Sequence, residues 1–465
     1  MAIATVNPAT GETLKTFDAL NAGEIEDCLV RAERAFQEHR LTSFAHRAER
    51  MLKAADLLDA DQDSVARTMT TEMGKPLAQA RAEAAKCAKT MRWYATHAEE
   101  LLADEHPDPA DVHDSGAARA VVRYRPLGTV LAVMPWNFPL WQVVRFAAPA
   151  LMAGNTGLLK HASNVPQTAL YLAELFRRAG FAEGCFQTLL IGSGAVEDLL
   201  RDPRVAAATL TGSEPAGRSV AAIAGDEVKK TVLELGGSDP YLVMPSADLD
   251  KAVRTAVTAR VQNNGQSCIA AKRFIVHTDV YDTFAARFTE RMAGLTVGDP
   301  MEEHTDVGPL SSEQGRSDLE ELVDDAVHRG ATALCGGRRP PEHRAGWYYE
   351  PTVLSGITPG MRIHQEEAFG PVATLYRVED LDEAIALAND SPFGLGSNAW
   401  TRDADEQGRL ARDLQAGGVF FNGMTASHPG LPFGGAKRSG YGRELSGHGM
   451  REFCNMTTVW YGPED

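Results

Sequence analysis

The feature that most constrains the fold is a regular alternation of short apolar runs with helical patterns, beginning at Gly128. The runs 129–134, 156–159 and 206–210 have the length of single strands, and segments of helical length stand between them. Pro166 opens one of these segments, which suits the first turn of a helix. Apolar strands that alternate with helices indicate a parallel sheet covered on both faces. The pattern therefore predicts an α/β fold with a doubly wound parallel sheet.

The pattern repeats, so the sequence predicts a second sheet. A further block of strand-like runs and helices extends from Tyr241 to about Leu431. A chain of 465 residues is also too long for one hydrophobic core. Before the first block, apolar residues recur at helical spacing from Ala22 to about Leu102, which predicts a set of amphipathic helices. We expect two doubly wound parallel-sheet domains.

Two segments read as strands outside the two blocks: a candidate arm, and a tail with no obvious partner in its own block. One is the stretch 120–124, rich in valine, and the other is the tail 455–461. Apolar strand edges that stay unpaired favour association with another chain. We therefore expect a small β arm that serves oligomerisation, in a homodimer or homotetramer.

The overall charge and the cysteine pattern exclude several classes of partner. A formal net charge of −17 is unsuited to nucleic acid, whose phosphates are neutralised by clustered Lys and Arg. No apolar run has the roughly twenty residues that span a membrane, and the N-terminus lacks the pattern of a secretory signal. The six cysteines include no Cys-x-x-Cys pair. We expect a cytoplasmic protein with reduced thiols and without a bound metal, nucleic acid or membrane partner.

One cysteine stands where a thiol can meet a substrate. Cys268 follows a polar, glycine-containing turn, Glu234 closes an apolar run, and Asn137 lies in a proline-bracketed loop. A thiol, a carboxylate and an amide are the groups needed to form a thioester from a carbonyl and then hydrolyse it. Alone, each would more often be a buried cysteine, a surface glutamate or a turn asparagine. Their combination favours catalysis.

The chain resembles the NAD(P)-dependent aldehyde dehydrogenase family in seven segments that occur in the family's order. The segments are Val6–Gly11, Pro135–Pro139, Thr211–Ser213, Glu234–Gly237, Gln262–Cys268, Glu366–Pro371 and Pro432–Gly440. The resemblance implies the family's fold, with residues 1–116 and 127–236 as a dinucleotide-binding domain and 237–431 as a catalytic domain. Residues 117–126 and 450–465 would form the oligomerisation arm and tail, which pair across subunits in the family.

The resemblance assigns a role to each chemical group. Cys268 would attack the aldehyde, and loss of hydride would leave a thioester. Asn137 and the backbone N–H of Cys268 would donate hydrogen bonds to the oxygen that becomes negative. Glu234 would activate water against the thioester, helped by a pKa that burial raises. Ser238 stands where the family commonly has lysine, and we expect little effect on the chemistry.

The cofactor site, for NADP or NAD, is also implied by the resemblance, since the usual Gly-x-Gly-x-x-Gly fingerprint is absent. The pyrophosphate would lie near Gly212 and Ser213, because backbone N–H groups at a helix N-terminus bind anions. Further cofactor contacts would come from Trp136, Lys160, Glu367 and Phe369. Each of these, taken singly, is more often a surface charge or a core aromatic.

Ser163 bears on the choice of nucleotide. Family members restricted to NAD commonly carry a glutamate here, three residues after Lys160, and its carboxylate would repel a 2′-phosphate. Serine leaves room and can donate a hydrogen bond. We therefore predict that NADP is accepted as well as NAD, and that NADP can be the preferred nucleotide.

Arg145 indicates the class of aldehyde. It stands in an otherwise apolar helical stretch, where a guanidinium needs an anionic partner. A protein carboxylate is the usual partner, but the semialdehyde branch of the family has arginine here in contact with the substrate's distal carboxylate. The segments 440–445 and 453–455 also resemble bacterial succinate-semialdehyde dehydrogenases. The resemblance therefore implies oxidation of succinate semialdehyde to succinate.

Two positions depart from that branch. Some of its members have a second arginine where this chain has Gln262, and a second cysteine where it has Ala270. Carboxylate binding would then rest on Arg145 together with neutral donors, for which the candidates are Gln262, Ser427 and His428.

Other functions stay open on the sequence alone. The nearest alternative is a broad-range aldehyde dehydrogenase or one for another semialdehyde. An enzyme that passes the thioester to coenzyme A fits less well, because Glu234 is present to activate water. A nucleotide-independent cysteine hydrolase would lack an evident histidine partner for Cys268. An inactive protein on the same fold would have no reason to keep Cys268, Glu234 and Asn137 together.

Overall fold

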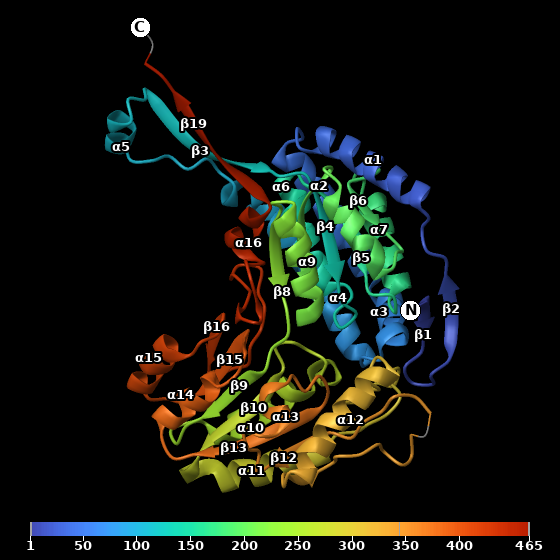
Figure 1. The fold of residues 1–465 in the computed structure, drawn as a ribbon, viewed down its shortest axis with the longest axis vertical. Coiled ribbons are helices and arrows are strands. Elements are labelled where there is room, and N and C mark those ends of the chain that lie inside the picture. Colours follow the sequence, from blue (N-terminus) through green and yellow to red (C-terminus); the bar gives the residue numbers. More distant parts are fainter. Residues whose placement is uncertain (1, 344, 464–465) are drawn as a thin grey trace.

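The computed structural model describes residues 2–343 and 345–463, and it shows two helix-covered sheets with a two-stranded arm that leaves the body (Figure 1). The first sheet has the order β18-β8-β7-β4-β5-β6 and is parallel except where β18 joins β8. Its strands are β4 (Thr129–Met134), β5 (Thr156–His161), β6 (Phe186–Thr188), β7 (Val205–Thr211), β8 (Lys230–Glu234) and β18 (Gly440–Tyr441). The apolar runs of the first block thus form a parallel sheet, as predicted.

The second sheet has the order β11-β12-β13-β10-β9-β15-β16 and is parallel except for the β11–β12 pair. Its strands are β9 (Asp239–Val243), β10 (Ala271–His277), β11 (Thr332–Cys335), β12 (Thr352–Ser355), β13 (Val372–Val378), β15 (Gly396–Trp400) and β16 (Gly418–Phe421). Two largely parallel sheets with intervening helices confirm the predicted α/β class.

Helices occupy the segments between strands. Those that precede or cross over the first sheet are α1 (Ala22–His39), α2 (Phe44–Ala60), α3 (Gln62–Met73), α4 (Leu77–Leu101), α6 (Trp141–Ala153), α7 (Pro166–Arg178), α8 (Val196–Arg201) and α9 (Glu214–Asp226). Those of the second are α10 (Leu249–Val261), α11 (Thr278–Ala293), α12 (Glu313–His328), α13 (Arg362–Gln365), α14 (Leu381–Asn389) and α15 (Ala404–Asp413). None of the helices in the described part of the chain is both long and apolar enough to cross a bilayer.

Short elements complete the chain. They are the hairpin β1 (Ile3–Val6) and β2 (Thr13–Phe17), the helices α5 (Pro109–Asp114) and α16 (Ser446–Glu452), the 3₁₀ turns η1 (Ser193–Ala195) and η2 (Gln262–Gly265), and the small pair β14 (Phe393–Gly394) and β17 (Ala436–Lys437). Pro166 lies in the first turn of α7, as predicted. The predicted amphipathic helices before the first sheet correspond to α1–α4.

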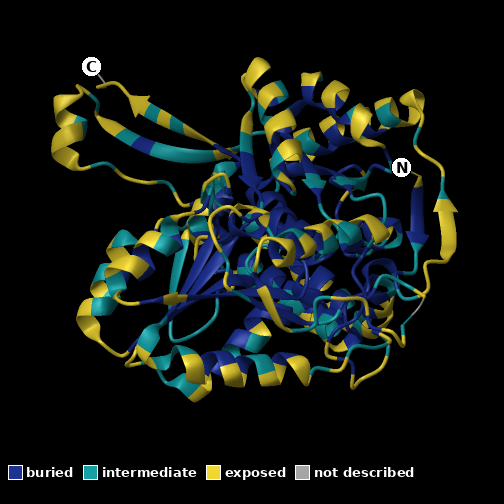
Figure 2. Cartoon of the chain, turned by 60° about the horizontal axis from the view of Figure 1, so that its bottom comes forward, coloured by how far each residue is buried: buried dark blue, intermediate teal, exposed yellow. Residues whose placement is uncertain are grey.

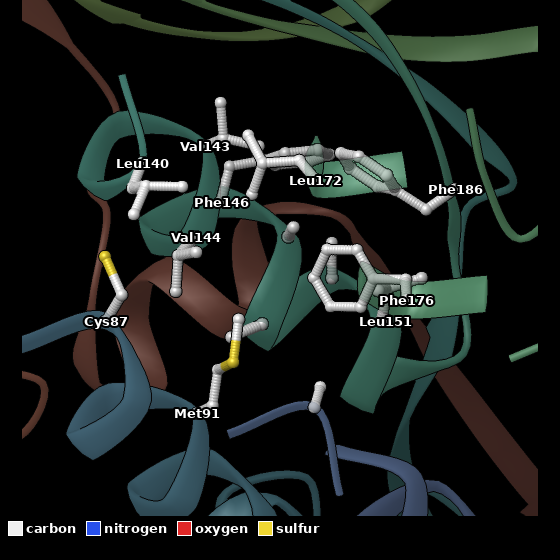
Figure 3. Close-up of a cluster of buried hydrophobic side chains, with 14 of the residues drawn as sticks. Cys87, Met91, Leu140, Val143, Val144, Phe146, Leu151, Leu172, Phe176 and Phe186 are labelled. Atoms are coloured by element: carbon white, nitrogen blue, oxygen red, sulfur yellow. The ribbon is translucent and has the colours of Figure 1, made fainter. Parts of the chain in front are cut away.

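Helix α6 lies in the largest apolar cluster, and its N-terminal end adjoins the loop that carries Asn137. All thirteen of its residues are buried, and α4 and the strands β4 and β5 pack against it. Figure 3 shows Val144 and Phe146 of α6 gathered with Met91 of α4 and Phe176 of α7. A helix enclosed on every side needs an apolar sequence all round. A charged residue on such a helix therefore needs a specific partner.

The arm consists of β3 (Arg119–Pro126) and β19 (Cys454–Tyr461), which pair antiparallel along their whole length. The tail, expected to lack a partner in its own block, pairs with the arm strand of the same chain, and pairing across subunits stays a prediction. This pairing satisfies the backbone groups on the facing edge of each strand and, within the described residues, leaves the outer edge of β19 open. The exposed residues along β19, shown in Figure 2, include Met456 and Trp460.

Candidate active site

The turn before Cys268 has an unusual backbone. After α10, Asn263 and Asn264 each have φ 57° and Gly265 has φ 73°. Asparagine and glycine adopt this left-handed conformation most readily, which explains why these residue types stand here. Gly265 is required for a second reason, because a Cβ there would lie 2.3 Å from the backbone of Gly370. The left-handed turn ends the helical path and starts the segment that carries the thiol.

Side-chain amides hold this turn to three other segments. Asn264 donates to the carbonyl oxygens of Gly74 at 2.8 Å and Pro309 at 2.9 Å. Asn263 donates to the carbonyl oxygen of Asn137 at 2.7 Å. These hydrogen bonds are buried, where the low dielectric strengthens them. These hydrogen bonds therefore fix the position of the turn and of the Cys268 segment that follows it.

Cys268 lines a cavity of about 570 Å³. Burial raises the pKa of its thiol to about 12, while the positive charges of Arg145 and Lys272 act in the opposite direction. The thiol form dominates at neutral pH, so a base must accept the proton when the sulfur attacks a carbonyl. The charge of Glu234 also acts on the thiol, which places that carboxyl group within electrostatic reach.

Glu234 is the last residue of β8, and its side chain is buried. Neither carboxylate oxygen has a hydrogen-bond partner among the described residues. Burial raises the pKa of Glu234 to about 8, while the charge of Arg145 lowers it and that of Glu444 raises it. A carboxyl group with a pKa near the working pH can accept and release a proton. The sequence predicted this burial and the raised pKa of Glu234.

The two glycines after Glu234 let three segments meet. A Cβ on Gly236 would lie 2.6 Å from Oε2 of Glu367, and one on Gly237 would lie 2.5 Å from the carbonyl oxygen of Cys268. The N–H of Gly237 also donates to Oε1 of Glu367 at 3.1 Å. The absence of side chains at these positions brings the backbone of the Glu234 segment against that of the nucleophile.

Asn137 lies beside the nucleophile segment, between β4 and α6. It is buried, and its Nδ2 donates to the carbonyl oxygen of Gln266 at 3.1 Å. An amide nitrogen has a second hydrogen to donate. Its Oδ1 has no partner among the described residues. The arrangement is compatible with donation to an oxyanion near Cys268, and that role stays a prediction.

Lys272 on β10 joins two parts of the site, and sequence reasoning missed it. Its buried Nζ donates to the carbonyl oxygens of Ser267 at 2.9 Å and Cys268 at 2.7 Å. The same Nζ forms an ion pair with Glu367 at 3.1 Å. The signal was present, since a lysine in the apolar run 271–276 requires an internal partner.

Three predicted cofactor residues lie at or after the carboxyl ends of strands: Trp136, Lys160 and Ser163. A fourth, Phe369, lies in the loop before β13. Trp136, which follows β4, contacts Phe369 edge to face, with ring centres 5.8 Å apart. Lys160 lies near the end of β5, where burial lowers the pKa of its ammonium. Ser163 follows three residues later and is half-buried. The carboxyl ends of parallel strands are where such sheets bind ligands.

Gly212 and Ser213 connect β7 to α9. The N–H of Gly212 donates to the carbonyl oxygen of Glu234 at 2.9 Å, and Ser213 forms no side-chain capping bond to α9. Backbone N–H groups in the first turn of α9 are thus available to an anion. Next to them lies a second cavity of about 820 Å³, lined in part by Glu214 and Glu367. Of the cofactor residues predicted from the sequence, Glu367 is the one among its lining residues, so the cofactor contacts stay a prediction.

Three of the four predicted substrate-binding residues line the same cavity as Cys268. They are Arg145, Gln262 and Ser427. His428 is exposed and is not among the lining residues, and its Nδ1 accepts a hydrogen bond from the N–H of Gly430 at 3.1 Å. Within the described residues, no group of His, Cys, Asp and Glu side chains is placed to hold a metal ion.

Arg145 already has an anionic partner within the protein. Its guanidinium forms an ion pair with Glu444, and both side chains are buried. It also donates to the hydroxyl of Thr211 at 3.3 Å and lies 4.7 Å from the centre of the Phe433 ring. Of the two partners weighed from the sequence, the protein carboxylate is present. Contact with a substrate carboxylate stays a prediction.

Replacing Arg145 with leucine is expected to lower the free energy of unfolding by about 3–5 kcal/mol, because Glu444 is left buried and unpaired. The double variant Arg145→Leu/Glu444→Leu removes both charges and should regain most of this loss. Chemical denaturation followed by tryptophan fluorescence measures both effects. If Arg145→Leu leaves stability unchanged and impairs only semialdehyde oxidation, the arginine acts on the substrate instead.

Comparison with known proteins agrees with this geometry. Residues 1–459 match the aldehyde dehydrogenase family. The chain is 66% identical over 463 residues to a succinate-semialdehyde dehydrogenase (NADP+) of Mycobacterium avium, covering 99% of this chain and 97% of the relative. It is 65% identical over 460 residues to that of Mycobacterium tuberculosis, covering 99% and 100%.

Solved structures give the same result. The succinic semialdehyde dehydrogenase of Streptococcus pyogenes in complex with NADP+ is similar with a TM-score of 0.95 at 36% identity, over 99% of this chain and 100% of the other. A whole-length match, two helix-covered parallel sheets and a thiol on a cavity wall together define the class. The chain belongs to the aldehyde dehydrogenase family.

Proposed function

We propose that this protein oxidises succinate semialdehyde to succinate, with NADP+ as the preferred hydride acceptor and NAD+ as the alternative. The observation that carries the proposal is the position of Cys268 on a cavity wall, with the Asn137 and Glu234 segments packed against its backbone segment. The 66% identity to a succinate-semialdehyde dehydrogenase (NADP+) supports the choice of substrate and nucleotide.

Cys268 supplies the nucleophile in this proposal. Its sulfur bonds to the aldehyde carbon as the thiol proton passes to solvent water, and the carbonyl oxygen becomes negative. The Nδ2 of Asn137 and the N–H of Cys268 donate hydrogen bonds to that oxygen. A bound nicotinamide dinucleotide supplies the acceptor for the hydride that leaves the same carbon. The acyl group then stays on the sulfur as a thioester until water releases the acid.

Glu234 supplies the base for hydrolysis. Its pKa of about 8 gives both protonation states near neutral pH, and the deprotonated carboxylate accepts a proton from the attacking water. Both oxygens lack partners among the described residues, so a water molecule can bind to either of them. The same carboxylate lies within electrostatic reach of the Cys268 thiol.

The nucleotide would be held by the first sheet's domain, while the second carries Cys268. The N-terminus of α9 at Gly212 and Ser213 would bind the pyrophosphate. Lys160 and Ser163 would contact the adenosine ribose and its 2′-phosphate. The nicotinamide half would be contacted by Trp136, Glu367 and Phe369.

An aldehyde panel assayed with NADP+ and NAD+ tests the proposal. We expect the highest kcat/KM with succinate semialdehyde and NADP+, read from the absorbance of the reduced nicotinamide. No absorbance change with any aldehyde would rule out a dehydrogenase, and equal efficiency with butanal would indicate a broad-range enzyme. In the Ser163→Glu variant the ratio of NADP+ to NAD+ efficiency should fall about tenfold or more, because like charges repel. An unchanged ratio would remove Ser163 from nucleotide choice.

We also propose that the protein works in the cytoplasm as a homodimer or homotetramer. The paired strands β3 and β19 project from the body with Met456, Trp460 and Tyr461 exposed. An exposed apolar patch of this kind favours association with a second copy. A molar mass equal to that of one chain, measured by light scattering, would contradict the proposed oligomer.

A further inference from the structure

Lys86 is a cation of the Cys268 cavity without an acidic partner. It lies on α4, is half-buried and lines the cavity. Its Nζ donates to Oγ of Ser427 at 2.6 Å and lies 3.9 Å from the centre of the Trp141 ring. Among the described residues, no carboxylate forms an ion pair with it, although other lysines and arginines of the site are so paired.

The neighbouring cations are already neutralised. Arg145 pairs with Glu444, and Lys75 pairs with Glu83. Glu83 is fully engaged, because its second oxygen accepts hydrogen bonds from two backbone N–H groups at the start of α6, each at 2.9 Å. Among the described residues that line the cavity, Lys86 therefore carries a positive charge that is not paired with a carboxylate.

We propose that Lys86, with Ser427 beside it, binds the distal carboxylate of the substrate. This rests on the proposed function, whose substrate carries such a group. An ammonium has three hydrogens to donate, and Ser427 occupies one of them. The face of Trp141 stabilises the cation while no anion is bound. Some members of the semialdehyde branch have an arginine at the position of Gln262. In this chain Lys86 would supply the positive charge instead.

The surroundings of Lys86 set its protonation state. Burial lowers the pKa of Lys86 to about 8, Cys87 and Glu83 on α4 raise it, and the charge of Arg145 on α6 lowers it. The remaining charged residues that line the cavity are the exposed Glu303 and Asp306. The ammonium is therefore present below about pH 8 and is lost above it.

Three variants test the role of Lys86. Lys86→Met removes the charge at nearly constant length, and we expect kcat/KM for succinate semialdehyde to fall about tenfold to a hundredfold, as for a hydrogen bond to a charged group. The kcat/KM for butanal, an uncharged aldehyde of equal length, should be unchanged. Lys86→Arg keeps the charge and should retain most of the efficiency. Lys89→Met, at an exposed lysine on the same helix, is the matched control.

A pH profile gives an independent readout. The ratio of kcat/KM for succinate semialdehyde to that for butanal should fall as the pH rises through about 8, since only the charged substrate uses the ammonium of Lys86. The titrations of Cys268 and Glu234 act on both substrates and cancel in the ratio. In Lys86→Met the ratio should be low and flat with pH.

The outcomes separate this inference from the function on which it rests. If the wild-type protein does not prefer succinate semialdehyde to butanal, the proposed function fails. If it does and Lys86→Met keeps that preference, the role of Lys86 alone is overturned. Equal losses with both aldehydes, in a variant whose circular dichroism matches the wild type, would also overturn it by making Lys86 structural.

Discussion

The Cys268→Ala variant is expected to oxidise aldehydes at least about 10⁴-fold more slowly than the wild-type protein, a loss of the order seen when a covalent nucleophile is removed. Of the described cysteines, Cys268 is the one that lines the cavity. Without its sulfur no acyl intermediate can form, so hydride has no tetrahedral carbon from which to leave. Initial rates of nicotinamide reduction with saturating succinate semialdehyde measure the loss.

Cys335→Ala provides a matched control for this variant. Cys335 lies on β11, is partly buried, and its thiol donates to the carbonyl oxygen of Pro351. We expect full activity after this change, since the thiol lies outside both cavities. Parental rates in Cys268→Ala would refute the thioester route and the proposed function with it.

In the Glu234→Gln variant, kcat should fall by about 10²–10⁴-fold, the usual contribution of a general base. Glutamine keeps the shape of the side chain and removes the proton acceptor. Attack by Cys268 and departure of the hydride precede hydrolysis, so one equivalent of reduced nicotinamide per active site should still appear rapidly. Stopped-flow absorbance would then show a burst followed by a slow phase.

The pH dependence of kcat gives a second measure of Glu234. Hydrolysis needs the carboxylate, whose fraction grows as the pH rises through the raised pKa of about 8. Wild-type kcat should therefore increase across this range, and the variant should lack the increase. A variant that loses the burst together with turnover would assign Glu234 to deprotonation of the sulfur, before the thioester exists.

The two sheets and the catalytic candidates could be predicted because their signals are local. Runs such as 129–134 carry strand length and hydrophobicity in a few consecutive residues. The turn before Cys268 is likewise readable, since asparagine and glycine mark a left-handed backbone. The resemblance to a family then ordered these local signals into a site.

Contacts between distant segments could not be predicted in this way. Lys86 and Ser427 are separated by 341 positions, and periodicity along α4 cannot distinguish a lysine facing a cavity from one facing solvent. The partner of Arg145 lies in the C-terminal segment at Glu444, so its identity depends on how that segment returns to the first sheet. His428 adjoins Ser427 in sequence, yet it does not line the cavity.

The ammonium of Lys272 donates hydrogen bonds to the carbonyl oxygens of Ser267 and Cys268. It also forms an ion pair with the carboxylate of Glu367. Glu367 also lines the larger cavity, so a molecule arriving there meets one end of a short, buried linkage whose other end is the nucleophile's own backbone. A ligand that displaced the Glu367 carboxylate would leave the Lys272 ammonium buried without its acidic partner, next to the backbone of Cys268.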